Sequence, residues 1–194
     1  MTWSRRRLLT AGGLLAGLSA AGVPMGRARA QEAPVSPAVA ADGAPAQRRI
    51  ALTNLHTDER LEIEYFREGM YIPAALSAIE VLLRDFRTGE RHAIDPTLMD
   101  YLLQVAHAAG VDPKFSVISG YRSPQTNARL REQSAGVAQH SLHMDGRAID
   151  VRVAGLDCAS LATHALDLTL GGVGYYRASD FVHLDTGAFR TWRG

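Results

Sequence analysis

The sequence has little cysteine and no long hydrophobic run. Cys158 is its one cysteine, so an internal disulfide bond is excluded. The fold must therefore hold by packing, with a metal ion as possible help. We expect Cys158 to be a small core residue and not a nucleophile. The apolar run near the N-terminus is short and weakly hydrophobic, which argues against a transmembrane span in the mature chain.

The first thirty residues have the layout of an export signal. A basic cluster from Arg5 to Arg7 precedes an apolar Gly/Ala-rich run, and Ala28-Arg29-Ala30 suits a cleavage site. The stretch Ser4-Arg-Arg-Arg-Leu-Leu9 resembles the twin-arginine signal, which carries folded proteins across the bacterial inner membrane. An ordinary signal with a basic start is the alternative. We expect a periplasmic protein, and leave open whether the signal is cleaved or retained as an anchor.

The sequence also lacks a large excess of positive or negative charge. The whole chain has 21 basic and 20 acidic residues. The first thirty residues hold five arginines and no acid, so their removal leaves 16 basic against 20 acidic residues. A mature chain with a small negative charge is a poor candidate for nucleic-acid binding, and we expect no such partner. The oligomeric state is not readable from the sequence, and a monomer is the expectation.

The remaining chain divides into a tether and one domain. Residues 31–48 are Ala/Pro-rich with little to bury, which indicates a flexible tether. Residues 49–194 are long enough for one domain with its own core. The expected elements are a hairpin at 49–66, helices at 73–87, 96–109, 124–132 and 157–170, and strands at 115–119, 147–153, 173–176 and 181–184. Helix caps are expected at Asp95, Ser123 and Asp157. This pattern predicts an α+β fold with a small, mostly antiparallel sheet and packed helices.

Two histidines and an aspartate stand out as possible metal ligands. A catalytic zinc takes three protein ligands, often histidines with a carboxylate, and keeps a position for water. His143 ends a loop and Asp150 lies in the strand that follows, so the two could meet if Gly146 lets the backbone turn sharply. His183, in another strand, would complete a His2Asp set with an open position. The alternative is a surface histidine, a strand cap and a core histidine, and the spacing alone does not decide.

Ser141 to Asp150, SLHMDGRAID, matches the SxHxxGxAxD motif of the zinc D-Ala-D-Ala metallopeptidases, the M15-type group. The stretches SGYRS at 119–123, GVGYY at 172–176 and FVHLDTG at 181–187 resemble other segments of that group. More narrowly, the chain resembles the murein endopeptidase K-like branch, once labelled DUF882. The shared features are the HT-x-E turn at 56–59, LRD-x-RTG at 83–89 and Ile-Asp-Pro at 94–96. The resemblance covers residues 49–193 and implies a hedgehog/D-Ala-D-Ala-peptidase-like fold.

The resemblance implies roles for particular residues. His143, Asp150 and His183 would hold one Zn²⁺, and Arg122 would stabilise the oxyanion of the tetrahedral intermediate. Many members carry a glutamate three residues before the last histidine as general base, and here that position is Asp180.

Asp185 is a second candidate for the base. It shares a strand face with His183 by alternation, so it would act either as the base or as the partner that holds the His183 ring. The sequence leaves Asp180 and Asp185 open as the base.

The implied function is that of an exported, zinc-dependent murein endopeptidase. It would hydrolyse peptide cross-links of peptidoglycan with a metal-activated water, cutting links between diaminopimelate residues as an L,D-endopeptidase. Peptidoglycan stem peptides would be its partners. The alternatives are a D-Ala-D-Ala carboxypeptidase or dipeptidase, and a non-catalytic zinc domain that binds the cell wall. The sequence contains no feature that selects the bond.

Overall fold

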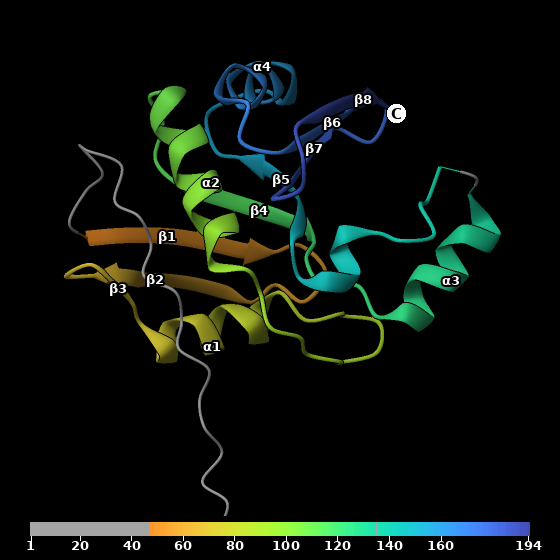
Figure 1. Ribbon diagram of the computed structural model, residues 1–194, viewed down its shortest axis with the longest axis horizontal. Helices are drawn as coiled ribbons and strands as arrows, with labels where there is room; N and C mark the ends of the chain where they lie inside the picture. The colour runs from red at the N-terminus through yellow and green to blue at the C-terminus, as the bar shows by residue number, and fades with distance from the viewer. Residues whose placement is uncertain (1–46, 135) are drawn as a thin grey trace, which may run out of the picture. The chain divides into compact units, whose positions relative to one another are not determined.

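The computed structural model describes residues 47–134 and 136–194, and Figure 1 shows their arrangement. The predicted export signal and residues 31–46 of the predicted tether lie outside the described residues. In chain order the elements are β1 (Gln47–Asn54), β2 (Arg60–Arg67), β3 (Met70–Tyr71), α1 (Pro73–Leu82), α2 (Pro96–Ala108), β4 (Lys114–Ser119), α3 (Pro124–Gln133), the 3-10 turn η1 (Leu142–Asp145), β5 (Ala148–Val153), α4 (Cys158–Leu168), β6 (Gly172–Tyr176), β7 (Phe181–Asp185) and β8 (Arg190–Arg193). Strand β1 starts two residues before the expected domain start at 49.

One eight-stranded sheet organises the domain, in the order β3-β2-β1-β4-β5-β7-β6-β8. Strands β1 and β4 pair in parallel, as do β6 and β8, and the other neighbours are antiparallel. The predicted α+β class is confirmed, but the sheet is mixed rather than mostly antiparallel. The reason is that α1 and α2 return the chain so that β4 runs alongside β1, and parallel neighbours need such a long connection. The short strands β3 and β8 were not predicted from the sequence.

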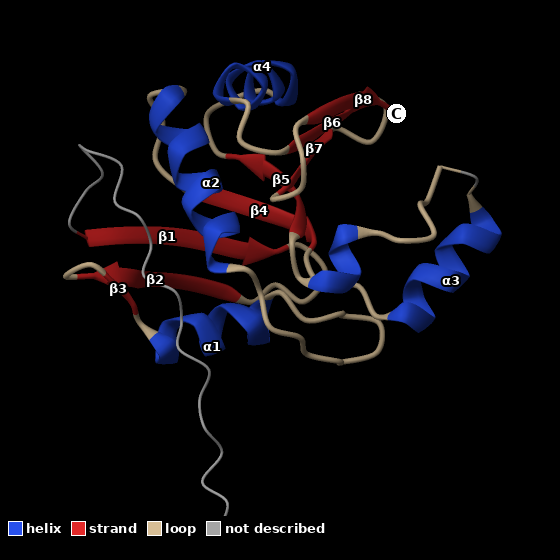
Figure 2. Cartoon of the chain, viewed as in Figure 1, coloured by secondary structure: helices blue, strands red, loops and turns tan. Residues whose placement is uncertain are grey.

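Three helices cover one face of the sheet. Helix α1 packs on β2, α2 contacts β1 and β5, and α4 contacts β5, β6 and β7. Figure 2 shows these helices along the sheet and α3 standing apart from it. Strand alternation and register give this face a row of buried apolar side chains: Ile50, Leu52, Phe115, Val117, Ile149, Val151, Val153, Val173, Val182 and Leu184. Within residues 47–134 and 136–194, no helix is both long and apolar enough to cross a membrane.

The predicted helix caps are present. The side chain of Asp95 accepts from the Thr97 amide, that of Ser123 from Thr126, and that of Asp157 from Ser160. The first helix is shorter than expected, because α1 ends at Leu82 and not at residue 87. Residues 85–90 instead form a turn in which the Gly89 amide donates to the Asp85 carbonyl. Cys158 is buried at the start of α4, as expected of a core residue.

Asp85 ties this turn to the start of α3. Its carboxylate is buried and accepts hydrogen bonds from the Ser123 amide at 3.0 Å, the Ser123 hydroxyl at 2.6 Å and the Arg87 amide at 3.0 Å. Burial opposes ionisation of Asp85, but the hydrogen bonds from Ser123 and its neighbours hold the pKa below the usual value. The Tyr121 amide also donates to the Leu83 carbonyl at 2.8 Å. The segment between Tyr121 and Ser123 is therefore fixed from both ends, and Arg122 lies within it.

We predict that Asp85→Ala lowers the free energy of unfolding by about 3 kcal/mol, because it leaves buried donors of Ser123 without an acceptor. Urea denaturation followed by circular dichroism measures the change. Asp112→Ala is the matched control, because Asp112 is an exposed carboxylate paired with exposed Lys114 and such pairs contribute about 1 kcal/mol or less. Equal losses in the two variants would contradict the structural role of Asp85.

Candidate metal centre

The three proposed ligands lie on the sheet face that the helices leave uncovered. Antiparallel pairing of β5 with β7 puts Asp150 opposite His183. The row continues through Gly174 on β6 to Trp192 on β8. Successive residues of a strand point to opposite faces, so Asp150 and His183 point away from the apolar face that carries Ile149 and its neighbours. One row across four strands therefore forms the floor of the site.

His143 reaches this row from the turn before β5. It lies in η1, which ends at Gly146 in the left-handed conformation at φ 65°. A Cβ at residue 146 would also lie 2.0 Å from the Ala93 carbonyl oxygen. Both observations require glycine at this position. The Asp95 amide then donates to the Gly146 carbonyl at 2.9 Å, which fixes the turn against the start of α2.

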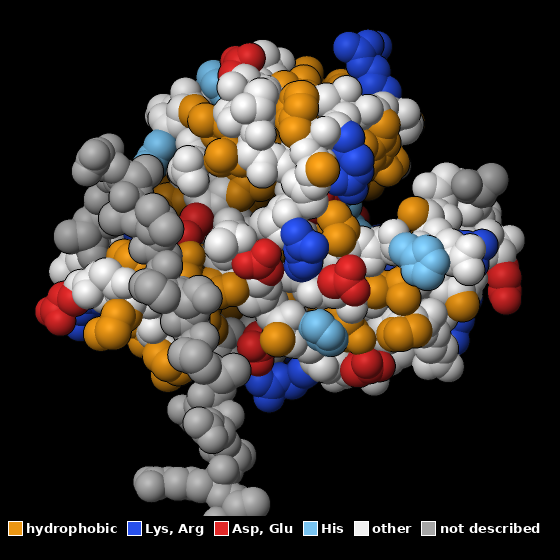
Figure 3. Space-filling model, in the orientation of Figure 1, with side chains coloured by type: hydrophobic (Ala, Val, Ile, Leu, Met, Phe, Trp, Pro, Cys, Tyr) orange, Lys and Arg blue, Asp and Glu red, His pale blue; other side chains and the backbone are white. Residues whose placement is uncertain are grey.

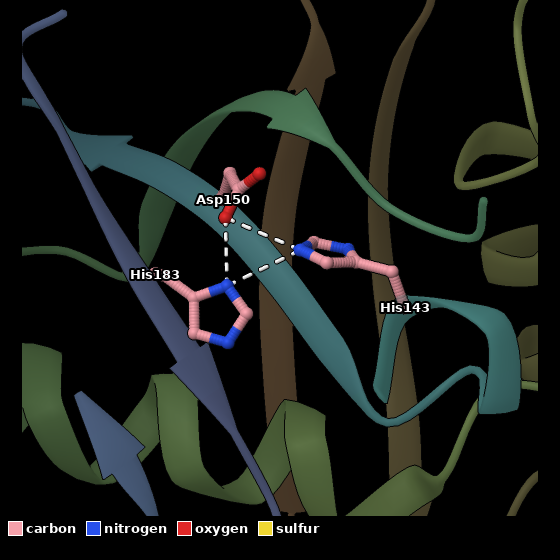
Figure 4. A group of neighbouring side chains, drawn as sticks. All are labelled: His143, Asp150 and His183. Carbon is pink, nitrogen blue, oxygen red and sulfur yellow. Dashed lines mark hydrogen bonds and ion pairs between the residues drawn. The ribbon is translucent and has the colours of Figure 1, made fainter. Parts of the chain in front are cut away.

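Three ligand atoms converge in the centre (Figure 4). The Asp150 Oδ1 atom lies 2.9 Å from His183 Nδ1 and 3.3 Å from His143 Nε2, and the two nitrogens are 3.2 Å apart. Tetrahedral zinc with bonds of about 2.0–2.2 Å places two of its ligand atoms about 3.4 Å apart. All three residues are buried, and this trio is the group within the described chain whose spacing suits a metal ion. The donor set and its spacing therefore fit zinc.

The outer nitrogen of each histidine has its own partner. His143 Nδ1 lies 2.7 Å from the Gly120 carbonyl oxygen, which can only accept, so we assign the proton to Nδ1. His183 Nε2 lies 2.9 Å from Asp185 Oδ2, which places a proton on Nε2. Such partners fix the tautomer and the orientation of ligand histidines. The free lone pair of His143 is therefore on Nε2, which faces the centre.

Asp185 supports His183 from the side away from the other ligands. It is fully buried, and its carboxylate also accepts from Arg190 at 2.7 and 2.9 Å and from the Gly187 amide at 2.8 Å. Burial opposes ionisation of Asp185, yet the hydrogen bonds from His183 and Arg190 hold its pKa far below the usual range. This carboxylate is ionised and fully engaged in holding the ring.

The protonation states of the three proposed ligands depend on their burial and on the contacts they make with one another. Burial lowers the pKa of His143, which keeps its imidazole neutral. Burial also opposes ionisation of Asp150, but His143 and His183 hold the pKa of that carboxyl well below its usual range. Burial lowers the pKa of His183 too, but its hydrogen bonds to Asp150 and Asp185 outweigh this and raise it. A metal ligand must be the neutral imidazole, so a cation and a proton compete for His183 Nδ1.

Arg122 lies beside the centre. Its amide donates to the His143 carbonyl at 3.1 Å, and its Nη2 atom lies 3.7 Å from Asp150 Oδ2. The side chain is largely buried, and its Nε has no hydrogen-bond partner within the described chain. Burial lowers the pKa of Arg122, while the negative charge of Asp150 acts in the opposite direction. A guanidinium forms its strongest hydrogen bonds with anionic oxygens.

The structure does not bring Asp180 to the centre. Its side chain is exposed and lies 3.2 Å from Arg152, and its carbonyl also accepts from the Arg152 Nε. Its backbone has a φ of 52° in the turn before β7. Of the two carboxylates that the sequence left open, Asp185 contacts a proposed ligand and Asp180 does not.

A cavity of about 410 Å³ opens onto the ligands. One wall is the segment after α3, represented by Val137, His140 and Leu142, and the other is the aromatic group of Tyr176, Phe181 and Trp192. Figure 3 shows the surface hollowed between the lobe around α3 and the body of the domain. His143, Asp150 and His183 line the cavity between these two walls.

Sequence reasoning missed three residues of this site: Arg190, Tyr176 and Trp192. Arg190 and Trp192 lie on β8, whose parallel pairing with β6 has no local sequence signal. Tyr176 could have been found by alternation, because it lies two residues after Gly174, which is the neighbour of His183.

Comparison with known proteins gives consistent matches. The family model described as peptidoglycan L,D-endopeptidase MepK matches residues 42–192. The chain is 39% identical over 189 residues to the peptidoglycan L,D-endopeptidase MepK of Escherichia coli K12, covering 97% of each chain. It is 42% identical over 151 residues to the probable peptidoglycan L,D-endopeptidase MepK of Haemophilus influenzae, covering 77% of this chain and 81% of the relative. The chain therefore belongs to the M15-type family of the peptidoglycan L,D-endopeptidase MepK, a family of peptidoglycan hydrolases.

Proposed function

We propose that the protein is a zinc-dependent endopeptidase that hydrolyses peptide cross-links of peptidoglycan between diaminopimelate residues. The observation that carries the proposal is the convergence of His143 Nε2, Asp150 Oδ1 and His183 Nδ1 beside the cavity. The relatives described above are named as a peptidoglycan L,D-endopeptidase and a probable one, and these names support an L,D-endopeptidase activity.

We assign the metal to His143, Asp150 and His183. When bound there, Zn²⁺ supplies a Lewis acid that activates water near neutral pH. The chain contributes the fixed orientation of its ligands. His143 is held by the Gly120 carbonyl and His183 by Asp185, so the ligands need little rearrangement to receive the ion.

Arg122 is proposed to stabilise the oxyanion that forms when the peptide carbonyl is attacked. The supporting observation is that the guanidinium is largely buried beside Asp150 and that its Nε has no hydrogen-bond partner among the described residues. A fixed positive charge in a largely buried site stabilises developing negative charge without having to reorganise. In the absence of substrate, the weak contact with Asp150 offsets only part of the cost of burying Arg122.

Asp185 is proposed to position His183 and not to act as the base. Its oxygens accept from His183, Arg190 and backbone amides, and it does not line the cavity. Nothing in the geometry supports Asp180 as the base, because its carboxylate lies beside Arg152, outside the cavity.

The proposed place of action is the periplasm. The supporting sequence features are the basic cluster at 5–7 and the cleavage-site pattern at 28–30. A hydrolase of peptidoglycan needs to reach the cell wall, so export by the twin-arginine route agrees with the proposed substrate.

We predict that the purified zinc-loaded chain digests sacculi and leaves products in which the links between diaminopimelate residues have been cut. His143→Ala removes a ligand, so its activity should fall to background, and a chelator should do the same until zinc is restored. Mass analysis of the digest measures both the amount and the bond cleaved. His107→Ala is the matched control, because His107 lies on α2 and does not line the cavity.

Other outcomes separate the alternatives. Release of free D-alanine alone would favour a carboxypeptidase or dipeptidase. Stoichiometric zinc with no turnover would favour a cell-wall-binding domain. Normal activity in His143→Ala would overturn the assignment of the metal centre.

We predict that Asp185→Asn weakens zinc binding by about 10- to 100-fold, because it removes the carboxylate that orients His183. Competition with a chromophoric chelator measures the zinc affinity. Asp180→Asn makes the same chemical change three residues before His183, and it should leave both zinc affinity and turnover within about twofold of wild type. A large loss of turnover in Asp180→Asn with unchanged zinc affinity would instead identify Asp180 as the base.

A further inference from the structure

Trp192 occupies a gap that glycine leaves beside His183. Gly174 lies between His183 on β7 and Trp192 on β8. A Cβ at residue 174 would lie 2.4–2.6 Å from atoms of the Trp192 indole, so glycine is what lets the indole lie across β6. The indole and imidazole rings then have centroids 5.0 Å apart. The position of Trp192 is thus set by the same row of the sheet that holds Asp150 and His183.

The indole nitrogen of Trp192 donates to the Tyr176 hydroxyl oxygen at 2.9 Å. An indole N–H can only donate, so the tyrosine hydroxyl must accept in this contact. The hydroxyl proton of Tyr176 therefore points away from Trp192. No acceptor for this proton occurs among the hydrogen bonds of the described side chains, and both residues line the cavity above the ligands.

The Tyr176 ring is held in place. It stacks on Phe181 with centroids 4.5 Å apart and an interplanar angle of 15°. Tyr176 pairs with Phe181 across β6 and β7, two residues along from the pair of Gly174 and His183. The ring thus lies on the same sheet face as the proposed ligands, and it lines the same cavity as Arg122.

We infer that the Tyr176 hydroxyl donates a hydrogen bond to the substrate oxygen that becomes negatively charged, with Trp192 aiming that hydroxyl. Arg122 and Tyr176 would then be two donors on this oxygen. The tyrosine keeps its proton throughout, because it donates a hydrogen bond and transfers nothing. The inference rests on the proposed peptidase function and adds a catalytic residue, Tyr176, and a positioning residue, Trp192.

The test compares Tyr176→Phe with Tyr175→Phe. Both changes remove one hydroxyl from neighbouring residues of β6, but Tyr175 lies on the opposite face, packs against the core and lines a different cavity beside α4. Tyr176→Phe should lower kcat on sacculi by on the order of 10²-fold, the effect of losing one donor to an oxyanion. Its zinc content and unfolding midpoint should stay as in wild type. Tyr175→Phe should keep kcat within about twofold.

A double-mutant cycle tests the part assigned to Trp192. Trp192→Phe keeps an aromatic ring but removes the N–H that aims the hydroxyl. It should lower kcat in the wild-type background and have little further effect in Tyr176→Phe, because both changes act through one hydroxyl. Additive losses would show that Trp192 acts by packing alone and would overturn its positioning role.

A binding measurement separates this inference from the choice of substrate. The probes are two phosphinate pseudo-dipeptides, one built from diaminopimelate and one from D-alanine, whose tetrahedral P–O⁻ imitates the charged oxygen. Calorimetry on the zinc-loaded chain should show affinities about 10- to 100-fold weaker in Tyr176→Phe than in Tyr175→Phe, as expected for one hydrogen bond to a charged acceptor. Equal affinities would overturn the inference. The expected loss of affinity in a protein that leaves sacculi intact would refute the proposed substrate and retain the role of Tyr176.

Discussion

The antiparallel pairing of β5 with β7 is the constraint on which the site depends. It places Asp150 opposite His183 on one face, and Ile149 opposite Leu184 on the other. A slip of one residue would turn Asp150 into the apolar face and expose Ile149. The hydrophobic core therefore fixes the register, and the register brings two of the three proposed ligands together. The position of the site and the stability of the sheet have the same origin.

Small residues provide the room that this arrangement needs. Gly146 permits both the left-handed turn and the close approach to the Ala93 carbonyl, which bring His143 toward Asp150. Gly172 does the same for the support of His183, since a Cβ there would lie 2.3 Å from an oxygen of Asp185. Large functional groups thus lie beside positions without a side chain. A side chain introduced at such a glycine would therefore displace a functional residue next to it, although the glycine itself takes no part in the site.

The sequence predicted what depends on local pattern. Caps such as Asp95 and Asp157 follow from side-chain chemistry next to a helix, and the structure contains them. Alternation correctly placed Asp185 on the face of His183. Long-range pairing could not be predicted from the sequence. The parallel pairing of β8 with β6, which places Trp192 beside Gly174, has no local sequence signal.

Asp180 shows a second limit of sequence reasoning. Asp180 lies three residues before His183, where many family members carry the general base. The φ of 52° and the contact with Arg152 depend on a turn that this spacing does not reveal. The proposed function rests on the resemblance to a family, since the spacing of His143 and Asp150 alone left the metal undecided.

The one-sided packing of helices explains why the chemistry lies where it does. Helices α1, α2 and α4 take the apolar face, so polar groups that must meet a substrate are left with the other. There the chain buries Arg122, whose Nε finds no hydrogen-bond partner in the part of the chain that the structure describes, and this costs stability in the free protein. Asp150 at 3.7 Å offsets this only weakly. In the proposed mechanism, a substrate oxygen that gains negative charge supplies the missing partner of Arg122. The stability lost in the free protein would then be regained in the transition state and not in the ground state.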